Sequence, residues 1–237
     1  MAKKLTTRVG DLRGLQVLIT AGPTWEYLDE VRFLSNPSTG LMGMELARAC
    51  QKLGGNVTVV CGPTHLQAPP GIALVPVVSA QEMLEAVTER FDHCNVFIAS
   101  AAVSDYRPAR REQGKVKKGA EKMVIEFVLN PDVLKAMGAR RRDDQIVIGF
   151  SLETANEIEN ARRKLQEKNC DLMVVNTPQH FGQAKEFVRI ISARGLVAEL
   201  PPSTKTKVAE AVVDLVAKLN VSARLPVVKP FDTKGKK

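Results

Sequence analysis

The chain has 237 residues, of which 44% are hydrophobic and 25% charged, the composition of an ordinary globular protein with one large domain. No apolar run approaches the roughly 18–20 residues of a membrane helix, and the segment MAKKLTTRVG lacks the apolar stretch of a secretory signal. We therefore expect a cytoplasmic protein with no membrane partner. The net charge of +8 invites a nucleic-acid-binding interpretation, but part of the basic excess lies at the two ends and only 5% of the residues are aromatic.

Short apolar, β-branched runs alternate with segments of helical periodicity, which predicts a mainly parallel sheet. Strands are expected over residues 16–20, 56–61, 73–78, 95–101, 123–129, 145–150 and 171–176. Helices are expected over 41–53, 80–90, 155–168 and 203–219, with a short one opened by 130–132. The late segments 186–192 and 196–200 are expected to form a hairpin. We predict one α/β domain of three layers over 15–219, between an N-terminal tail (1–14) and a basic C-terminal tail (220–237).

The four cysteines lie in or beside apolar stretches, at Cys50, Cys61, Cys94 and Cys170. None is paired as C-x-x-C, and no two lie near a histidine at zinc-site spacing. We therefore expect four buried free thiols.

Ligands of open parallel sheets bind beyond the carboxyl ends of the strands, and small residues there let a planar base or a phosphate approach the backbone. The expected strand ends carry such residues, among them Gly22, Ala99, Ser100 and Ala101. The G-x-G-x-x-G fingerprint is absent after the first strand, which counts against a nicotinamide-dependent reductase, and the Walker pattern is also absent. Ser38 or Thr39 is expected to cap the helix that follows Gly40, where free N–H groups would hold an anion; a plain helix cap is the alternative.

Basic residues suited to phosphate occur at two places. The segment 114–119 (GKVKKG) would close as a lid over a triphosphate, with Lys115 and Lys117 on one face when the chain is extended. Lys164 and Lys168 lie one helical turn apart. At both places a solvated charged surface is the alternative.

Several short motifs follow one another in a fixed order. They are LITAGPT (18–24), VRFLSNPSTG (31–40), AAVSDY (101–106), KVKK (115–118), NPD (130–132), GF (149–150) and KN (168–169). This ordered set resembles the phosphopantothenate–cysteine ligases, and it extends from about residue 15 to 217. In many bacteria this domain is fused behind a flavin-dependent decarboxylase. The resemblance thus implies a stand-alone nucleotide-binding ligase domain on a Rossmann-like sheet, with a separate decarboxylase acting next in the pathway.

The resemblance also implies a two-step reaction. The carboxylate of 4'-phosphopantothenate attacks the α-phosphorus of CTP, or of ATP, and expels pyrophosphate. The cysteine amine then attacks the acyl nucleotide, and the charge that builds in both steps needs fixed donors. Mg2+ would accompany the triphosphate, and the protein would be a homodimer whose loop after the first strand reaches the neighbouring site.

The resemblance gives roles to particular residues. The catalytic residues would be Asn36, which contacts the acyl phosphate, and Lys115, which stabilises phosphate charge. The nucleotide-binding residues would be Lys115 with Ala99, Ser100, Ala101, Asp105, Pro131, Asp132, Val133, Leu134, Phe150, Lys164 and Lys168. The loop that holds substrate or phosphate would comprise Gly22, Ser38, Thr39 and Gly40. It implies no protein ligand for the metal.

Some positions depart from the pattern of that family. Leu41 stands where lysine is usual, Trp25 where arginine is common, and Ser151-Leu152 where two small residues are commoner. The segment that ends in Glu186 lacks an expected asparagine. The alternatives that stay open are a degenerate ligase with another role, a nicotinamide-dependent reductase and a basic nucleic-acid-binding module.

Overall fold

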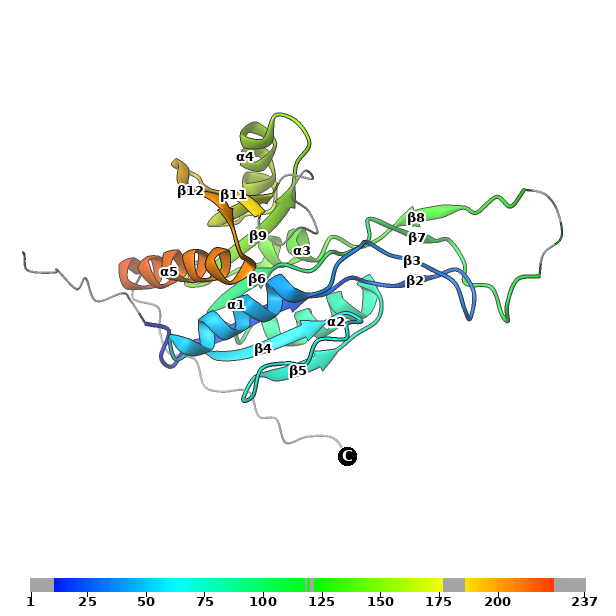
Figure 1. Cartoon of the computed structure of the whole chain (residues 1–237), viewed down its shortest axis with the longest axis horizontal. Helices are drawn as coiled ribbons and strands as arrows, with labels where there is room; N and C mark the ends of the chain where they lie inside the picture. Colours follow the sequence, from blue (N-terminus) through cyan, green and yellow to red (C-terminus); the bar gives the residue numbers. More distant parts are fainter. Residues whose placement is uncertain (1–10, 118, 120–121, 177–185, 224–237) are drawn as a thin grey trace, which may run out of the picture.

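The computed structural model describes residues 11–117, 119, 122–176 and 186–223, and these form an eight-stranded sheet with helices on both faces (Figure 1). The strand order is β12 (Gly195–Ser203), β11 (Glu186–Ser192), β10 (Leu172–Asn176), β9 (Ile146–Leu152), β6 (Val96–Ala99), β1 (Gln16–Ala21), β4 (Asn56–Cys61) and β5 (Ala73–Pro76). From β10 to β5 the neighbours are parallel, whereas β11 and β12 are antiparallel. The predicted α/β fold with a small antiparallel addition is confirmed.

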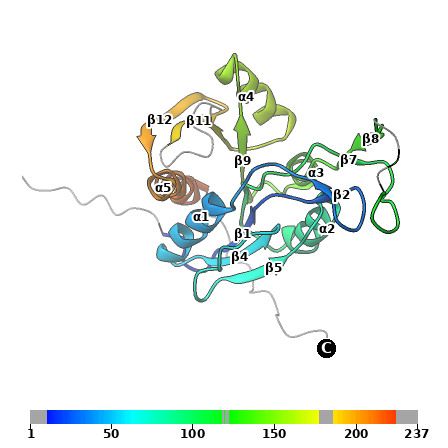
Figure 2. The same cartoon turned by 45° about the vertical axis from the view of Figure 1, so that its right-hand side comes forward.

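The alternating side chains of the strands build two cores, one on each face of the sheet. Val17 and Ile19 belong to the core covered by α1 (Leu41–Lys52) and α5 (Lys205–Ala223). Leu18 belongs to the opposite core, under α2 (Ala80–Phe91), α3 (Val133–Arg140) and α4 (Glu157–Glu167). Figure 2 shows α1 and α5 to one side of β1 and β4, and α2 to the other. Continuous apolar runs form these strands because both of their faces are covered.

Two short antiparallel ribbons extend from the sheet on the same side of the molecule (Figure 1). One pairs β2 (Glu26–Tyr27) with β3 (Phe33–Leu34), and the other pairs β7 (Tyr106–Pro108) with β8 (Phe127–Leu129). The prediction of a strand over 123–129 that continues the sheet is therefore wrong. Only 127–129 is a strand, it pairs outside the sheet, and the apolar Val124 is 95% exposed.

The helix cap predicted from the sequence is present at α2 but not at α1. Ser79 caps α2 as predicted, accepting a hydrogen bond from the N–H of Glu82 at 3.2 Å. Asp132 caps α3 by accepting one from the N–H of Lys135 at 2.9 Å. The expected capping of α1 by Ser38 or Thr39 is wrong: the N-cap is Gly40, in the left-handed region at φ 80°, with no side-chain capping hydrogen bond.

The packed part of the chain begins slightly before the expected boundary, since Leu12 is fully buried and its N–H donates to the carbonyl of Leu53 at 2.9 Å. At the other end α5 continues to Ala223. All four cysteines are buried free thiols, as predicted. Among the helices in the described ranges, none is both long and apolar enough to cross a membrane.

Candidate functional site

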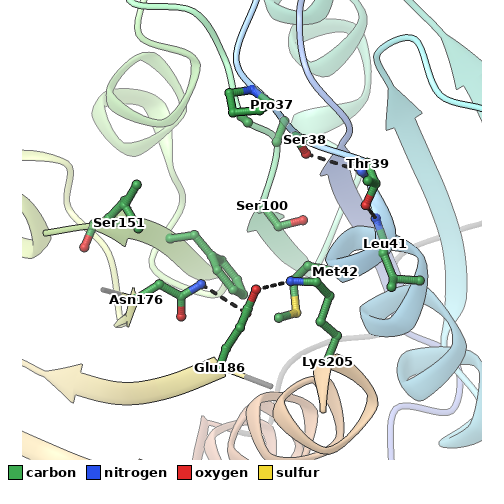
Figure 3. Close-up of a pocket in the computed structure, with 15 residues that line it drawn as sticks. Pro37, Ser38, Thr39, Leu41, Met42, Ser100, Ser151, Asn176, Glu186 and Lys205 are labelled. Carbon is green, nitrogen blue, oxygen red and sulfur yellow. Dashed lines mark hydrogen bonds and ion pairs between the residues drawn. The ribbon is translucent and has the colours of Figure 1, made fainter. Parts of the chain in front are cut away.

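A cavity of about 530 Å³ opens at the carboxyl end of the parallel strands (Figure 3). This is the edge of an open α/β sheet at which ligands bind. Predicted site residues in its lining are Ser38, Thr39, Gly40, Ser100, Ala101 and Phe150. Sequence reasoning gave no site role to the other lining residues, which are Pro37, Leu41, Met42, Ala102, Ser151, Leu152, Asn176, Glu186 and Lys205.

The cavity has this shape because α1 lies directly on the ends of β1 and β6. A Cβ atom added at Gly43 would lie 2.4 Å from the Cβ of Ala21 and 3.1 Å from the Oγ of Ser100. Ser100 is itself held, because its hydroxyl donates to the carbonyl of Thr20 at 2.6 Å. Gly22, at φ 75°, keeps the loop turned away from the strand without the strain that a side chain would bring.

One end of the cavity suits an anion. The first residues of α1 and the loop before it line this end, and Figure 3 shows Ser38 and Thr39 beside Leu41. The positive end of the helix dipole favours negative charge at such a terminus. The N–H groups of Gly40 and Leu41 donate over 3.3 and 3.4 Å to the hydroxyls of Ser38 and Thr39, and an anion would take the place of these long contacts. Thr64 fixes the loop, since its hydroxyl donates to the carbonyl of Thr39 at 2.7 Å.

The opposite end is built by a charged cluster from the antiparallel addition. Glu186, at the start of β11, forms an ion pair with Lys205, the first residue of α5. Asn176, at the end of β10, donates its amide N–H to the Oε2 of Glu186 at 3.3 Å. Glu186 reaches this edge because β11 runs antiparallel to β10, which brings the start of one strand beside the end of the other. Figure 3 shows these three side chains converging beside Met42.

Asn36 and Lys115, the two expected catalytic residues, lie outside the lining of the cavity, and of the two only Asn36 contacts a residue of that lining. The side-chain amide of Asn36 donates to the carbonyl of Val103 at 3.0 Å, next to Ala102 of the lining. The segment of Lys115 is held through its neighbour Val116, whose N–H donates to the Oδ2 of Asp29 at 3.1 Å.

Asp29 is the buried residue that organises this contact. Its carboxylate also accepts hydrogen bonds from the N–H groups of Arg32 at 2.7 Å and Val31 at 2.8 Å. The pKa of Asp29 lies below its usual value of 3.8, mainly because its carboxylate accepts the N–H of Arg32. The N–H groups of Val31 and Val116 also lower the pKa, whereas burial of the carboxylate opposes the shift. The side chain of Arg32 donates in turn to the carbonyl of Val116 at 3.1 Å, so the turn after β2 and the predicted lid segment are connected twice.

The remaining predicted nucleotide residues lie outside the lining of the cavity, and several of them form a second group at the start of α3. Ala99 is the last residue of β6. Lys168 pairs with the capping residue Asp132 at 2.9 Å, and Lys164 pairs with the buried Glu153 at 2.7 Å. Each lysine of the predicted pair thus has its own carboxylate partner. The carbonyl of Asp105 accepts a hydrogen bond from the N–H of Asn130 at 2.8 Å, which joins its segment to this group. The group includes Pro131, Val133 and Leu134.

The comparison with known proteins decides the family. The family described as DNA/pantothenate metabolism flavoprotein C-terminal domain matches residues 12–219 of this chain. The chain belongs to this family. A solved structure, the C-terminal domain of the coenzyme A biosynthesis bifunctional protein CoaBC, is 39% identical, with a TM-score of 0.78 over 89% of this chain and 98% of that chain.

Two curated relatives give the length comparison. CoaBC of Bacillus subtilis is 39% identical over 214 residues, which are 88% of this chain and 52% of that protein. A protein of an unknown prokaryotic organism, named cysteine/cysteine sulfinic acid decarboxylase, is 38% identical over 216 residues, 89% of this chain and 60% of that protein. The chain therefore spans about half to three fifths of these relatives. The membership that the ordered motifs indicated is confirmed.

Proposed function

We propose that this chain is a phosphopantothenate–cysteine ligase that acts in the cytoplasm on the route to coenzyme A. The observation that carries the proposal is the cavity between the start of α1 and Phe150, at the ligand-binding edge of the sheet, in a chain of this family. Its product would pass to a separate flavin-dependent decarboxylase. The proposed co-substrate is CTP, with ATP as the alternative.

The proposed reaction has two displacements. A carboxylate oxygen of 4'-phosphopantothenate attacks the α-phosphorus of the nucleotide, and the bond to pyrophosphate breaks. The cysteine amine then attacks the acyl carbon, loses a proton and expels the nucleoside monophosphate. Both steps put negative charge on phosphate and acyl oxygens, and fixed donors in a site shielded from water stabilise such charge.

We assign the donors as follows. The amide N–H group of Asn36, now on the carbonyls of Val103 and Ala102 at 3.0 and 3.4 Å, would turn to the acyl phosphate oxygen. Lys115 would bring a positive charge onto the departing pyrophosphate when its segment closes, because an ammonium acts as a compact point charge for phosphate. The N–H groups at the start of α1 would hold a phosphate that the nucleotide presents to Ser38 and Gly40.

Magnesium would enter with the triphosphate. In the described part of the chain no group of three or more histidine, cysteine, aspartate or glutamate side chains is placed to hold a metal ion. Mg2+ in such sites keeps several waters and is bound mainly by substrate phosphates, so this donor set fits a metal carried by the nucleotide. It would neutralise phosphate charge, and the chain's own residues would orient the reactants.

A homodimer is part of the proposal, and the two ribbons support it. They expose large apolar side chains that a single copy leaves in contact with water, among them Phe33, Leu34, Tyr106, Phe127 and Leu129. The ribbon of β2 and β3 is stiffened by stacking of Trp25 on Phe33, with ring centroids 4.2 Å apart. Rigid apolar side chains that gather on one side of a molecule are typical of a protein interface.

The proposal is tested by pyrophosphate release from purified protein with 4'-phosphopantothenate and magnesium, with CTP or ATP, with and without cysteine. Release that requires phosphopantothenate is expected, and product formation is expected to require cysteine. Asn36→Asp should still release pyrophosphate but form product slowly, whereas Lys115→Gln should slow release itself. Arg48→Gln, on the exposed side of α1, is the control and should behave as wild type. The absence of release with both nucleotides would refute the ligase assignment.

A further inference from the structure

A buried threonine of the turn after β1 holds the loop that follows β6. The Oγ1 atom of Thr24 accepts a hydrogen bond from the N–H of Ser104 at 3.0 Å. Thr24 is fully buried, and Ser104 is 3% exposed. Two residues earlier, the N–H of Ala102 donates to the carbonyl of Gly22 at 2.9 Å. The turn after β1 therefore determines which way the peptide groups of this loop face.

One peptide group, between Val103 and Ser104, connects Thr24 to Asn36. This peptide is trans, and in a planar trans peptide the C=O and the N–H point in opposite directions. Its N–H faces Thr24, so its carbonyl oxygen faces the other side of the loop, where it accepts a hydrogen bond from the side-chain amide of Asn36 at 3.0 Å. The orientation that the buried hydroxyl sets is therefore the orientation that holds Asn36.

The side chain of Asn36 depends on this carbonyl for its direction. Asn36 is exposed, and an exposed side chain keeps its rotamer freedom unless a fixed partner holds it. The other contact of its amide is with the carbonyl of Ala102 at 3.4 Å, which is longer than an ordinary N–H to oxygen hydrogen bond. The carbonyl of Val103 therefore sets the direction from which Asn36 would turn to the acyl phosphate.

The next peptide group of the loop is held by a second residue. The side-chain amide of Asn130 donates to the carbonyl of Ser104 at 2.8 Å, and the N–H of Asn130 donates to the carbonyl of Asp105 at 2.8 Å. Arg107 in turn donates to the Oδ1 of Asn130 at 3.3 Å. The N–H and the C=O of Ser104 thus both have fixed partners. Rotation of either peptide would break a hydrogen bond of a buried group, which is costly.

We propose that Thr24 is a positioning residue for the second step of the reaction, because it orients the peptide group that holds Asn36. This inference rests on the role that the proposed function gives to Asn36. Thr24→Val keeps the branched shape of the side chain but removes the acceptor, so the buried N–H of Ser104 is left without a partner. The peptide then gains by turning this N–H to another acceptor, and the carbonyl that holds Asn36 turns with it. Thr24→Ser keeps the hydroxyl oxygen and should keep the orientation.

The kinetic test compares the two partial reactions in the full-length protein. Pyrophosphate release in a single turnover without cysteine measures the first step, and product formation with cysteine includes the second. Thr24→Val should slow product formation by about tenfold or more and leave pyrophosphate release little changed, whereas Thr24→Ser should resemble wild type. In the Asn36→Asp background, Thr24→Val should cause little further loss, because residues that act through one another are not additive. Val216→Ala, which deletes buried methyl groups of α5, is the control for lost stability and should slow neither step.

A second readout does not depend on turnover. In nitrogen-15 NMR spectra of the ligand-free protein, the side-chain amide of Asn36 is identified as the signal that Asn36→Asp removes. Thr24→Val should move this signal toward that of a free asparagine amide, whereas Thr24→Ser and Val216→Ala should leave it in place. If Thr24→Val fails to fold, Asn130→Ala carries the test, since it frees the carbonyl of Ser104 and should move the same signal.

The outcomes separate this inference from the proposed function. An unmoved Asn36 signal in the folded variant would overturn the positioning role, and so would an equal loss in both partial reactions, because that result indicates a purely structural role. Full activity of Thr24→Val in both steps would overturn it while the ligase assignment stands. If wild type released no pyrophosphate, the ligase assignment alone would fail, and a displaced Asn36 signal would still support the orienting role of Thr24.

Discussion

Gly43 is the residue on which the contact between α1 and the sheet depends most directly. A Cβ atom there would lie 2.4 Å from the Cβ of Ala21, and both atoms are fixed to backbone. Carbon atoms in ordinary contact are about 3.5 Å apart, so Gly43→Ala must push the start of α1 about 1 Å away from β1. The same shift moves the helix relative to Ser100, which lines the cavity.

The stability change follows from two opposing terms. Overpacking of a buried contact costs about 1–3 kcal/mol. Alanine stabilises a helix interior relative to glycine by about 1 kcal/mol, which offsets part of that cost. Because both colliding atoms are fixed to backbone, the upper end of that cost applies, and we expect Gly43→Ala to lower the free energy of unfolding by about 2 kcal/mol. Turnover should fall by about tenfold or more, since displacement of a binding wall by about 1 Å disturbs the alignment of reactants.

Removing the methyl group of Ala21 provides the matched test. Ala21→Gly deletes the atom with which the new Cβ collides, so the double variant should be more stable than the sum of the two single effects by about 1 kcal/mol or more. Chemical denaturation of the four proteins measures this coupling, and steady-state turnover should recover in parallel. Strict additivity of the two changes, or a Gly43→Ala protein as stable and active as wild type, would refute the packing argument.

Three further predictions concern other regions of the molecule. Asp29→Asn should lower turnover, because it loosens the segment of Lys115. The pKa of Asp29 is lowered in the folded protein, so the stability that its carboxylate contributes is present above pH 3.8 and is lost as the pH falls through the folded pKa. Thermal unfolding of wild type and variant should therefore converge in acid, and a difference that persists there would contradict the assignment. Gly138→Ala places a Cβ 1.9 Å from the carbonyl oxygen of Lys168, so it should destabilise the fold by about 2–3 kcal/mol in a denaturant titration, and a neutral effect would exclude this close contact. Burial raises the pKa of three of the four thiols to about 12, so a disulfide reagent at pH 8 should label the native protein far more slowly than the unfolded one; rapid labelling would count against their burial.

The sheet could be predicted because its strands are buried on both faces. Every residue of the run over 16–20 is buried, and the structure extends the strand by one residue to Ala21. The ribbons could not be predicted in the same way. The two residues of β2 and of β3 are too few for any periodicity to be detected, and the apolar run over 123–129 resembles a buried strand although Val124 is exposed.

The site was predicted in part, for a related reason. Residues in or just after the carboxyl ends of parallel strands, such as Phe150 and Ser100, could be placed at one edge from topology alone. Glu186 comes from the antiparallel addition, where nothing in the local pattern tells which end of a strand lies beside the ligand, and Lys205 comes from the helix that follows it. A buried carboxylate also has no local signature, because only the tertiary fold brings Lys205 to it.

Three of the departures from the family pattern lie around the same cavity. Leu41, Glu186 and the pair Ser151-Leu152 all line the cavity, whereas Asn36 and Lys115 lie outside the lining. Substitutions that gather around one cavity alter how its ligand is held, and they leave the donors that we assign to the reaction untouched. If the chain is a ligase, these departures should therefore change which nucleotide binds and how tightly, with the two-step chemistry conserved. The nucleotide affinities and the pyrophosphate assay measure these two properties separately, and for this reason they belong in the same experiment.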